Sequence, residues 1–99
     1  MRVRILTSAF RDLEKGREFY EKQSQGLGAY FFDSVFIDID SLAHFGGIHL
    51  KVLGHHRLLA KRFPYAIYYK IDADGSAVVH RVLDCRQHPG KTSRALKDT

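Results

Sequence analysis

Residues 61–91 read KRFPYAIYYKIDADGSAVVHRVLDCRQHPGK, and this stretch decides the fold. Two runs, 65–71 and 76–83, are rich in Tyr, Ile and Val, which are typical of strands. The segment 72–75 between them ends in Asp-Gly, a strong hairpin signal. The stretch therefore predicts a β-hairpin whose outer ends meet, with Arg62 entering the first strand and Arg86 and His88 following the second.

The residues just before this hairpin predict two further strands, 48–53 and 57–62. A short polar loop, Gly54-His55-His56, joins them. We interpret the two histidines as a hairpin tip and not as a metal pair, because neighbours on a strand point to opposite faces. Pro64 lacks a backbone donor, so it belongs at the start or the edge of a strand.

The first half of the chain predicts a short strand and two helices. Residues 2–6 alternate as in a strand, Ser8 is the expected N-cap of a helix, and this helix should end near Ser24. Its helically spaced residues are Phe10, Leu13, Arg17 and Tyr20. The second helix is expected from Leu27 to about His44, with Gly46-Gly47 ending it. Its buried stripe should be Phe31, Val35, Ile39 and Leu42, and its outward acids Asp33, Asp38 and Asp40.

These elements predict an α+β fold in which a small twisted antiparallel sheet carries an N-terminal helical hairpin on one face. The tail after Pro89 is expected to form a short helix at 91–96. A chain of 99 residues can bury one compact core. We therefore expect residues 1–99 to be a single domain.

Charge divides the chain into two unequal halves. The net charge is +5, with −1 on residues 1–43 and +6 on residues 44–99, and all six histidines lie in the second half. A basic sheet of this kind suits a polyanion or a negatively charged protein surface. The alternative is a basic surface that only keeps the protein soluble.

Several classes of protein do not fit the composition. No apolar run approaches the ~20 residues of a membrane span, and the N-terminus has no signal-peptide core. The single cysteine, Cys85, rules out an internal disulfide and every multi-cysteine metal motif, and we expect it to be buried. The sequence therefore predicts a cytoplasmic protein with no metal and no cofactor.

Five short motifs, in order and at their spacing, resemble the RelE/ParE superfamily of bacterial type II toxin–antitoxin toxins. They are Asp12-Leu13 with Tyr20, Gly26-Leu-Gly28 with Phe31 or Phe32, Arg62-Phe-Pro-Tyr65, Tyr68 or Tyr69, and Cys85-Arg-Gln-His-Pro89. The resemblance covers nearly the whole chain. It implies a plasmid-stabilisation type of toxin that forms a hetero-oligomer with a cognate acidic antitoxin, whose extended C-terminal region wraps around it.

The resemblance also implies two possible targets. ParE-like members inhibit DNA gyrase and have lost the nuclease residues, whereas RelE-like members cut mRNA on the ribosome without a metal. The Phe-Pro-Tyr motif and the Arg-x-x-Pro ending at Pro89 favour the ParE branch. Whether the protein is an enzyme is therefore left open. A third reading is a non-toxic module that binds nucleic acid.

If the protein is a ribonuclease, the catalytic residues are expected to be Arg62, Arg86 and His88. The two arginines would hold the phosphate, and the imidazole would serve as general acid or base. Nuclease members are expected to have Tyr after such a histidine, whereas this chain has Pro89. The alternatives are a surface role for His88 and a salt bridge from Arg86 to Asp84.

A binding surface for the target or the antitoxin is expected on the basic strands and the tail, where several weak contacts to a polyanion add up. Tyrosines on the sheet could also stack on unpaired bases. The candidate binding residues are Lys51, Arg57, Lys61, Arg62, Tyr65, Arg86, His88, Lys91 and Arg94.

Overall fold

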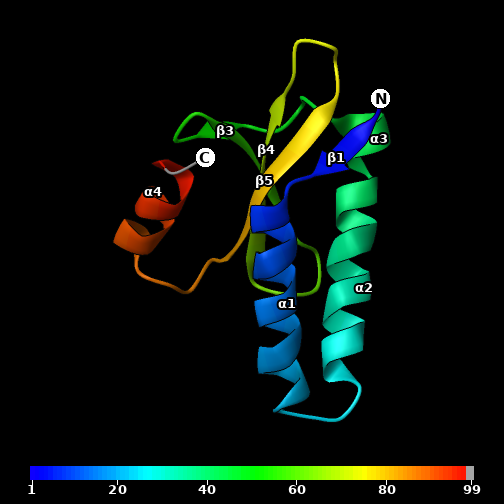
Figure 1. Cartoon of the computed structure of the whole chain (residues 1–99), viewed down its shortest axis with the longest axis vertical. Helices are drawn as coiled ribbons and strands as arrows, with labels where there is room; N and C mark the ends of the chain where they lie inside the picture. Colours follow the sequence, from blue (N-terminus) through cyan, green and yellow to red (C-terminus); the bar gives the residue numbers. More distant parts are fainter. Residues whose placement is uncertain (98–99) are drawn as a thin grey trace.

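The computed structural model describes residues 1–97, and its centre is a five-stranded sheet in the order β1-β5-β4-β3-β2 (Figure 1). The strands are β1 (Val3–Ile5), β2 (Lys51–Val52), β3 (His55–Leu59), β4 (Tyr65–Ile71) and β5 (Ala77–Asp84). The helices are α1 (Thr7–Glu21), α2 (Leu27–Asp40), α3 (Leu42–Phe45) and α4 (Pro89–Lys97). The predicted α+β fold is confirmed. Strands β2 to β5 are antiparallel, and β1 runs parallel to β5.

The β4–β5 hairpin has nearly the bounds that the sequence predicts. Its turn is closed by a hydrogen bond from the backbone N of Gly75 to the carbonyl of Asp72, at 2.9 Å, and Gly75 has a φ of 84°. The register shifts between Tyr68 and Tyr69, so that His80 is an extra residue on β5. Such a bulge increases the local twist of the hairpin.

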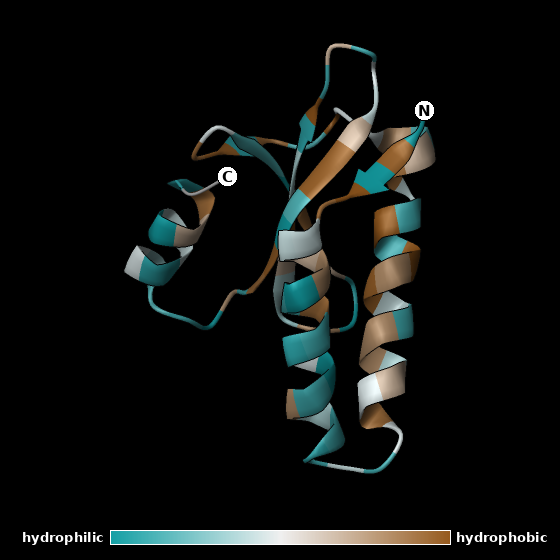
Figure 2. Cartoon of the chain, viewed as in Figure 1, coloured by the Kyte–Doolittle hydropathy of each residue, from teal (hydrophilic) through white to brown (hydrophobic). Residues whose placement is uncertain are grey.

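Helices α1 and α2 form an antiparallel pair that covers one face of the sheet (Figure 1). The apolar residues of α2 follow the predicted stripe, and Phe31, Val35, Ile39 and Leu42 are fully buried. Figure 2 shows how much more apolar α2 is than α1. A Cβ on Gly16 would lie 2.5 Å from the ring of Phe31, so glycine permits the close approach of the two helices.

Parts of the predicted helix faces and ends are wrong. The buried face of α1 consists of Ala9, Asp12, Leu13, Gly16 and Tyr20, whereas Phe10 and Arg17 are exposed. Leu6 occupies the N-cap position, because the hydroxyl of Ser8 donates instead to the carbonyl of His80, at 2.7 Å. Helix α2 ends at Asp40, and Asp38 is buried because its carboxylate accepts the backbone N–H of Lys61 at 3.0 Å.

The predicted hairpin tip at His55 and His56 is also wrong. Strand β3 begins at His55, and the turn before it consists of Leu53 and Gly54, with φ of 53° and 80°. Two consecutive positive φ angles are the signature of a tight two-residue hairpin turn. His55 is therefore a buried strand residue.

The tail helix α4 lies on the other face of the sheet from α1 and α2 (Figure 1). It begins at Pro89, two residues before the predicted start, and Leu96 packs against Ala66, Tyr68 and Leu83. No helix in residues 1–97 is long and apolar enough to cross a membrane.

Candidate functional site

The two outer ends of the β4–β5 hairpin meet, as the sequence predicts. Tyr65 pairs with Asp84, and the backbone N of Cys85 donates to the carbonyl of Pro64 at 2.8 Å. The loop that carries Lys61 and Arg62 therefore lies beside the turn at residues 85–88. The buried carboxylate of Asp38 fixes the start of this loop through the backbone of Lys61.

The guanidinium of Arg86 is held by Asp84. Its Nε and Nη2 donate to the two carboxylate oxygens at 3.0 and 2.8 Å, and Nη2 also reaches the hydroxyl of Tyr20 at 3.3 Å. The hydrogen bonds from Arg86 lower the pKa of Asp84, and in turn raise the pKa of Arg86. Arg86 therefore forms the salt bridge to Asp84 that the sequence analysis gave as the alternative to a functional contact. A phosphate that bound Arg86 would have to compete with the carboxylate of Asp84.

His88 lies at the start of α4 and acts as its N-cap. Its Nδ1 accepts the backbone N–H of Gly90 at 2.9 Å, and Pro89 occupies the first helical position, where a missing N–H costs nothing. Both residues therefore have a structural task that the sequence analysis did not assign. Lys91 and Arg94 are exposed on α4, one turn further along.

Tyr65 lies on the helix-covered face and is only 7% exposed. Its ring centroid is 4.8 Å from that of Phe31 and 6.3 Å from that of Tyr20. Burial and the nearby carboxylate of Asp84 raise the pKa of Tyr65 to about 12. Its ring is therefore part of the core and is not available as a stacking platform for bases.

The remaining candidates lie on β2 and β3. We call Lys61, Arg62, Arg86 and His88, at the outer ends of the hairpin, the hairpin-end group. Arg57 pairs with Tyr68, and its Nη2 contacts the sulfur of Cys85 at 3.8 Å, so it approaches this group from the face opposite the helices. Its Nε is buried without a hydrogen-bond partner among residues 1–97. Cys85 itself is exposed, which corrects the expectation that it is buried. Lys51 lies apart from the group, on the outermost strand.

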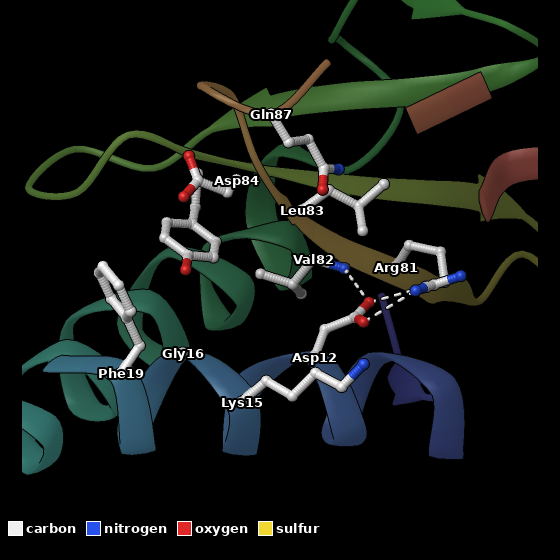
Figure 3. Close-up of a pocket in the computed structure, with 10 residues that line it drawn as sticks. Asp12, Lys15, Gly16, Phe19, Arg81, Val82, Leu83, Asp84 and Gln87 are labelled. Atoms are coloured by element: carbon white, nitrogen blue, oxygen red, sulfur yellow. Dashed lines mark hydrogen bonds and ion pairs between the residues drawn. The ribbon is translucent and has the colours of Figure 1, made fainter. Parts of the chain in front are cut away.

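A second polar centre, which the sequence analysis missed, lies between α1 and β5 (Figure 3). The buried carboxylate of Asp12 accepts two hydrogen bonds from Arg81, at 2.8 and 2.9 Å, and one from the backbone N of Val82, at 2.9 Å. A pocket of about 280 Å³ adjoins it, lined in part by Lys15, Phe19 and Gln87. The only signal for this centre in the sequence is Asp12, a charged residue on the same face of α1 as the apolar residues that pack on the sheet.

No cluster of three or more His, Cys, Asp or Glu side chains suited to a metal ion is present in the part of the chain that the structure describes. The hairpin-end group offers cations and one imidazole, so it can bind an anionic surface without a metal. Of its members, Arg62 forms no ion pair with residues 1–97, whereas Arg86 does.

Comparison with known proteins supports the fold. No protein-family model and no curated protein matches the sequence. A solved structure described as the chromosomal ParDE TA system from P. aeruginosa has a chain similar in fold, with a TM-score of 0.68. The match is 17% identical in sequence and covers 83% of this chain and 92% of that one. The fold that the family resemblance implies is therefore confirmed.

Proposed function

We propose that this protein is the toxin of a type II toxin–antitoxin system and that it acts as ParE-like toxins do, by inhibiting DNA gyrase. The observation that carries the proposal is the fold shared with a chain of a ParDE TA system over 83% of this sequence. The basic second half of the chain, at +6, is consistent with an acidic antitoxin as partner.

The arrangement at the hairpin end favours the gyrase reading over the ribonuclease. Metal-free RNA cleavage needs cations to stabilise the phosphorane and a group that transfers a proton. Here the guanidinium of Arg86 is engaged by Asp84, and Nδ1 of His88 caps α4. Arg86 and His88 therefore have structural roles that do not depend on catalysis. Lys91 and Arg94 are exposed and could contact a protein target.

The runner-up is a ribosome-dependent mRNA endoribonuclease that uses Arg62, Arg86 and His88. Arg62 and the Arg86 turn do lie at the same end of the hairpin, which is the observation in its favour. A non-toxic module that binds nucleic acid is the third candidate, and absence of growth inhibition on expression would distinguish it from both toxins.

The test compares two substitutions at one position. His88→Asn keeps a side-chain acceptor for the helix cap, whereas His88→Ala removes it, and both remove the imidazole. For a nuclease, both variants should lower mRNA cleavage roughly 100-fold or more. For a gyrase inhibitor, His88→Asn should keep full toxicity, and His88→Ala should lose little.

The assay is induction in cells, followed by primer extension on mRNA and a supercoiling assay with purified gyrase. We expect inhibited supercoiling and no codon-positioned cuts. Cuts that vanish in both variants while supercoiling is untouched would replace the gyrase assignment with the ribonuclease. Lys91→Glu combined with Arg94→Glu should weaken inhibition of gyrase more than either substitution of His88.

A further inference from the structure

The residues that flank the outermost strand, β2, include a cluster of apolar side chains exposed to solvent. Ile48, Leu50 and Leu53 are 72%, 85% and 58% exposed, and they lie within six residues at the edge of the sheet. Single exposed apolar residues are ordinary, but a cluster on a free edge strand is a template for pairing with another chain. We call the segment 48–53 the β2 edge.

The backbone of the β2 edge is oriented for such pairing. The carbonyl of Leu50 accepts the backbone N–H of Arg57 at 2.9 Å, so the backbone groups of Leu50 point toward β3. Groups on successive residues of a strand point to opposite sides. The N–H and C=O of Lys51 therefore point away from β3, and no strand among residues 1–97 lies beyond β2.

Leu53 occupies a position that its side chain makes unfavourable. Its φ of 53° lies in the left-handed region, where Gly or Asn is favoured and other residues cost about 1–2 kcal/mol. The side chain is nevertheless mostly exposed and gains little burial in return. Strained backbone clusters at binding and switch sites, which makes Leu53 a candidate contact for a ligand or partner.

A cationic pocket adjoins the β2 edge. It measures about 250 Å³ and is lined by Lys51, Gly54, His56, Lys70 and Ile71, with no carboxylate among them. Neither lysine forms an ion pair within residues 1–97. The Nδ1 of His56 donates to the carbonyl of His49 at 2.6 Å, so Nε2 of the neutral ring is an acceptor. The two lysines are therefore the groups that make the pocket suit a carboxylate.

The same charge argues against a second copy of this chain as the occupant. Antiparallel pairing of two β2 strands about a twofold axis would bring Lys51 close to its counterpart, and like charges directly opposite one another are destabilising. An extended segment that alternates apolar and acidic residues meets both demands, since it supplies apolar anchors for Leu50 and Leu53 and carboxylates for the lysines.

We propose that the β2 edge is the docking site for an extended segment of an acidic partner protein, which adds a sixth strand next to β2. Its main chain would pair with the N–H and C=O of Lys51, and one of its carboxylates would enter the pocket between Lys51 and Lys70. The inference rests on the proposed function only for the identity of the partner, which would be the antitoxin.

The test measures binding of the acidic protein encoded by the neighbouring reading frame. Leu50→Glu should raise the Kd by at least about 30-fold, as expected for a central interface residue. Ile37→Glu is the matched control, because Ile37 is an apolar residue on α2 that is 60% exposed, and it should change the Kd less than about threefold. Leu53→Asn should raise the melting temperature yet weaken binding.

The outcomes separate this inference from the proposed function. Tight binding that survives Leu50→Glu would overturn the docking site and leave the toxin assignment in place. Self-association of the wild type that Leu50→Glu abolishes would also overturn it, in favour of a contact between copies.

If the neighbouring protein does not bind at all, the proposed function fails. The docking site is then tested with a peptide of alternating Glu and Val. Its binding should shift the amide resonances of Lys51 and Leu53, whereas a Lys and Val peptide should not. An equal response to both peptides, or no response, would refute the docking site.

Discussion

The two edges of the sheet are treated in opposite ways. Beyond the end of β1, the edge of β5 is covered by α1, where Ser8 bonds to the carbonyl of His80 and Asp12 to the backbone N of Val82. At the other edge, no strand among residues 1–97 lies beyond β2, and Leu50, next to Lys51, is 85% exposed. The part of β5 that extends beyond β1 therefore has its partners within the chain, and the outer side of β2 is left available.

This difference separates stability from binding. Closing the β5 edge places a buried carboxylate where three donors satisfy it, which stabilises the fold and orients Arg81. An open apolar edge gives the isolated protein no stability and carries a risk of aggregation. We therefore expect substitutions at the β5 edge to affect unfolding, and substitutions at the β2 edge to affect association.

The largest effect should come from the core that lies beneath both edges. Val35→Asp would bury an unpaired carboxylate and should cost several kcal/mol, which is enough to unfold a domain of this size. Thermal melts followed by circular dichroism measure it. Ile37→Asp, two residues away on the exposed side of α2, should melt close to the wild type. Equal melting temperatures for Val35→Asp and the wild type would mean that the helix face is misplaced.

The next largest effect should come from Asp12→Ala at the closed edge. The variant leaves the guanidinium of Arg81 and the backbone N of Val82 without this acceptor, and loss of one partner of a buried pair costs about 3–5 kcal/mol. Urea denaturation measures the loss. Leu50→Ala at the open edge is the control, with an expected change within ~0.5 kcal/mol. Similar losses for both variants would remove the contrast between the edges.

A smaller effect should come from the hydroxyl of Tyr69, which fixes the segment leading into the β2 edge. It accepts the backbone N–H of Gly47 at 2.9 Å and pairs with Nδ1 of His49 at 2.5 Å. Tyr69→Phe should cost about 1–2 kcal/mol in urea denaturation. Hydrogen exchange in residues 48–53 should become faster, while the amide of Val82 stays as slow as in the wild type.

Three partly or fully buried histidines predict a dependence of stability on pH. Burial, followed by the charge of His56, lowers the pKa of His49, and burial also lowers the pKa of His55 and His80. The unfolded chain therefore binds protons below about pH 6.5 that the folded protein excludes, so stability falls as the pH drops through this range. Melting temperatures from pH 7.5 to 5.5 should decline, and more so in the wild type than in His49→Gln.

The smallest effect should come from the pair of Asp84 and Arg86, which lies at the surface with Arg86 exposed and Asp84 half-buried. Asp84→Asn should cost less than about 1 kcal/mol at neutral pH, because ion pairs at the surface contribute little. The hydrogen bonds from Arg86 lower the pKa of Asp84, so its contribution is present above pH 4 and lost as the pH falls further. A loss of stability in Asp84→Asn at neutral pH as large as that in Asp12→Ala would contradict this ranking.

Much of this structure could be predicted from periodicity and turn chemistry. The β4–β5 hairpin and the apolar stripe of α2 lie where the sequence places them, because both are set by local pattern. Asp38 and Ser8 were misplaced because their partners, Lys61 and His80, are distant in sequence. The β2–β3 hairpin was predicted but its turn was misplaced, because the turn uses Leu53 in place of a residue that favours a positive φ. The cap at His88 follows from Pro89 at the first helical position, a signal that was available.

Hydrogen–deuterium exchange of the protein, free and bound to the acidic protein of the neighbouring reading frame, tests the contrast between the edges most directly. In the free protein the amide of Val82 should exchange slowly, because Asp12 accepts it, and that of Lys51 quickly, because it points away from β3 at the end of the sheet. Binding should slow exchange at Lys51 and leave Val82 unchanged. Protection that appears along β5 or α1 while Lys51 remains fast would contradict the account.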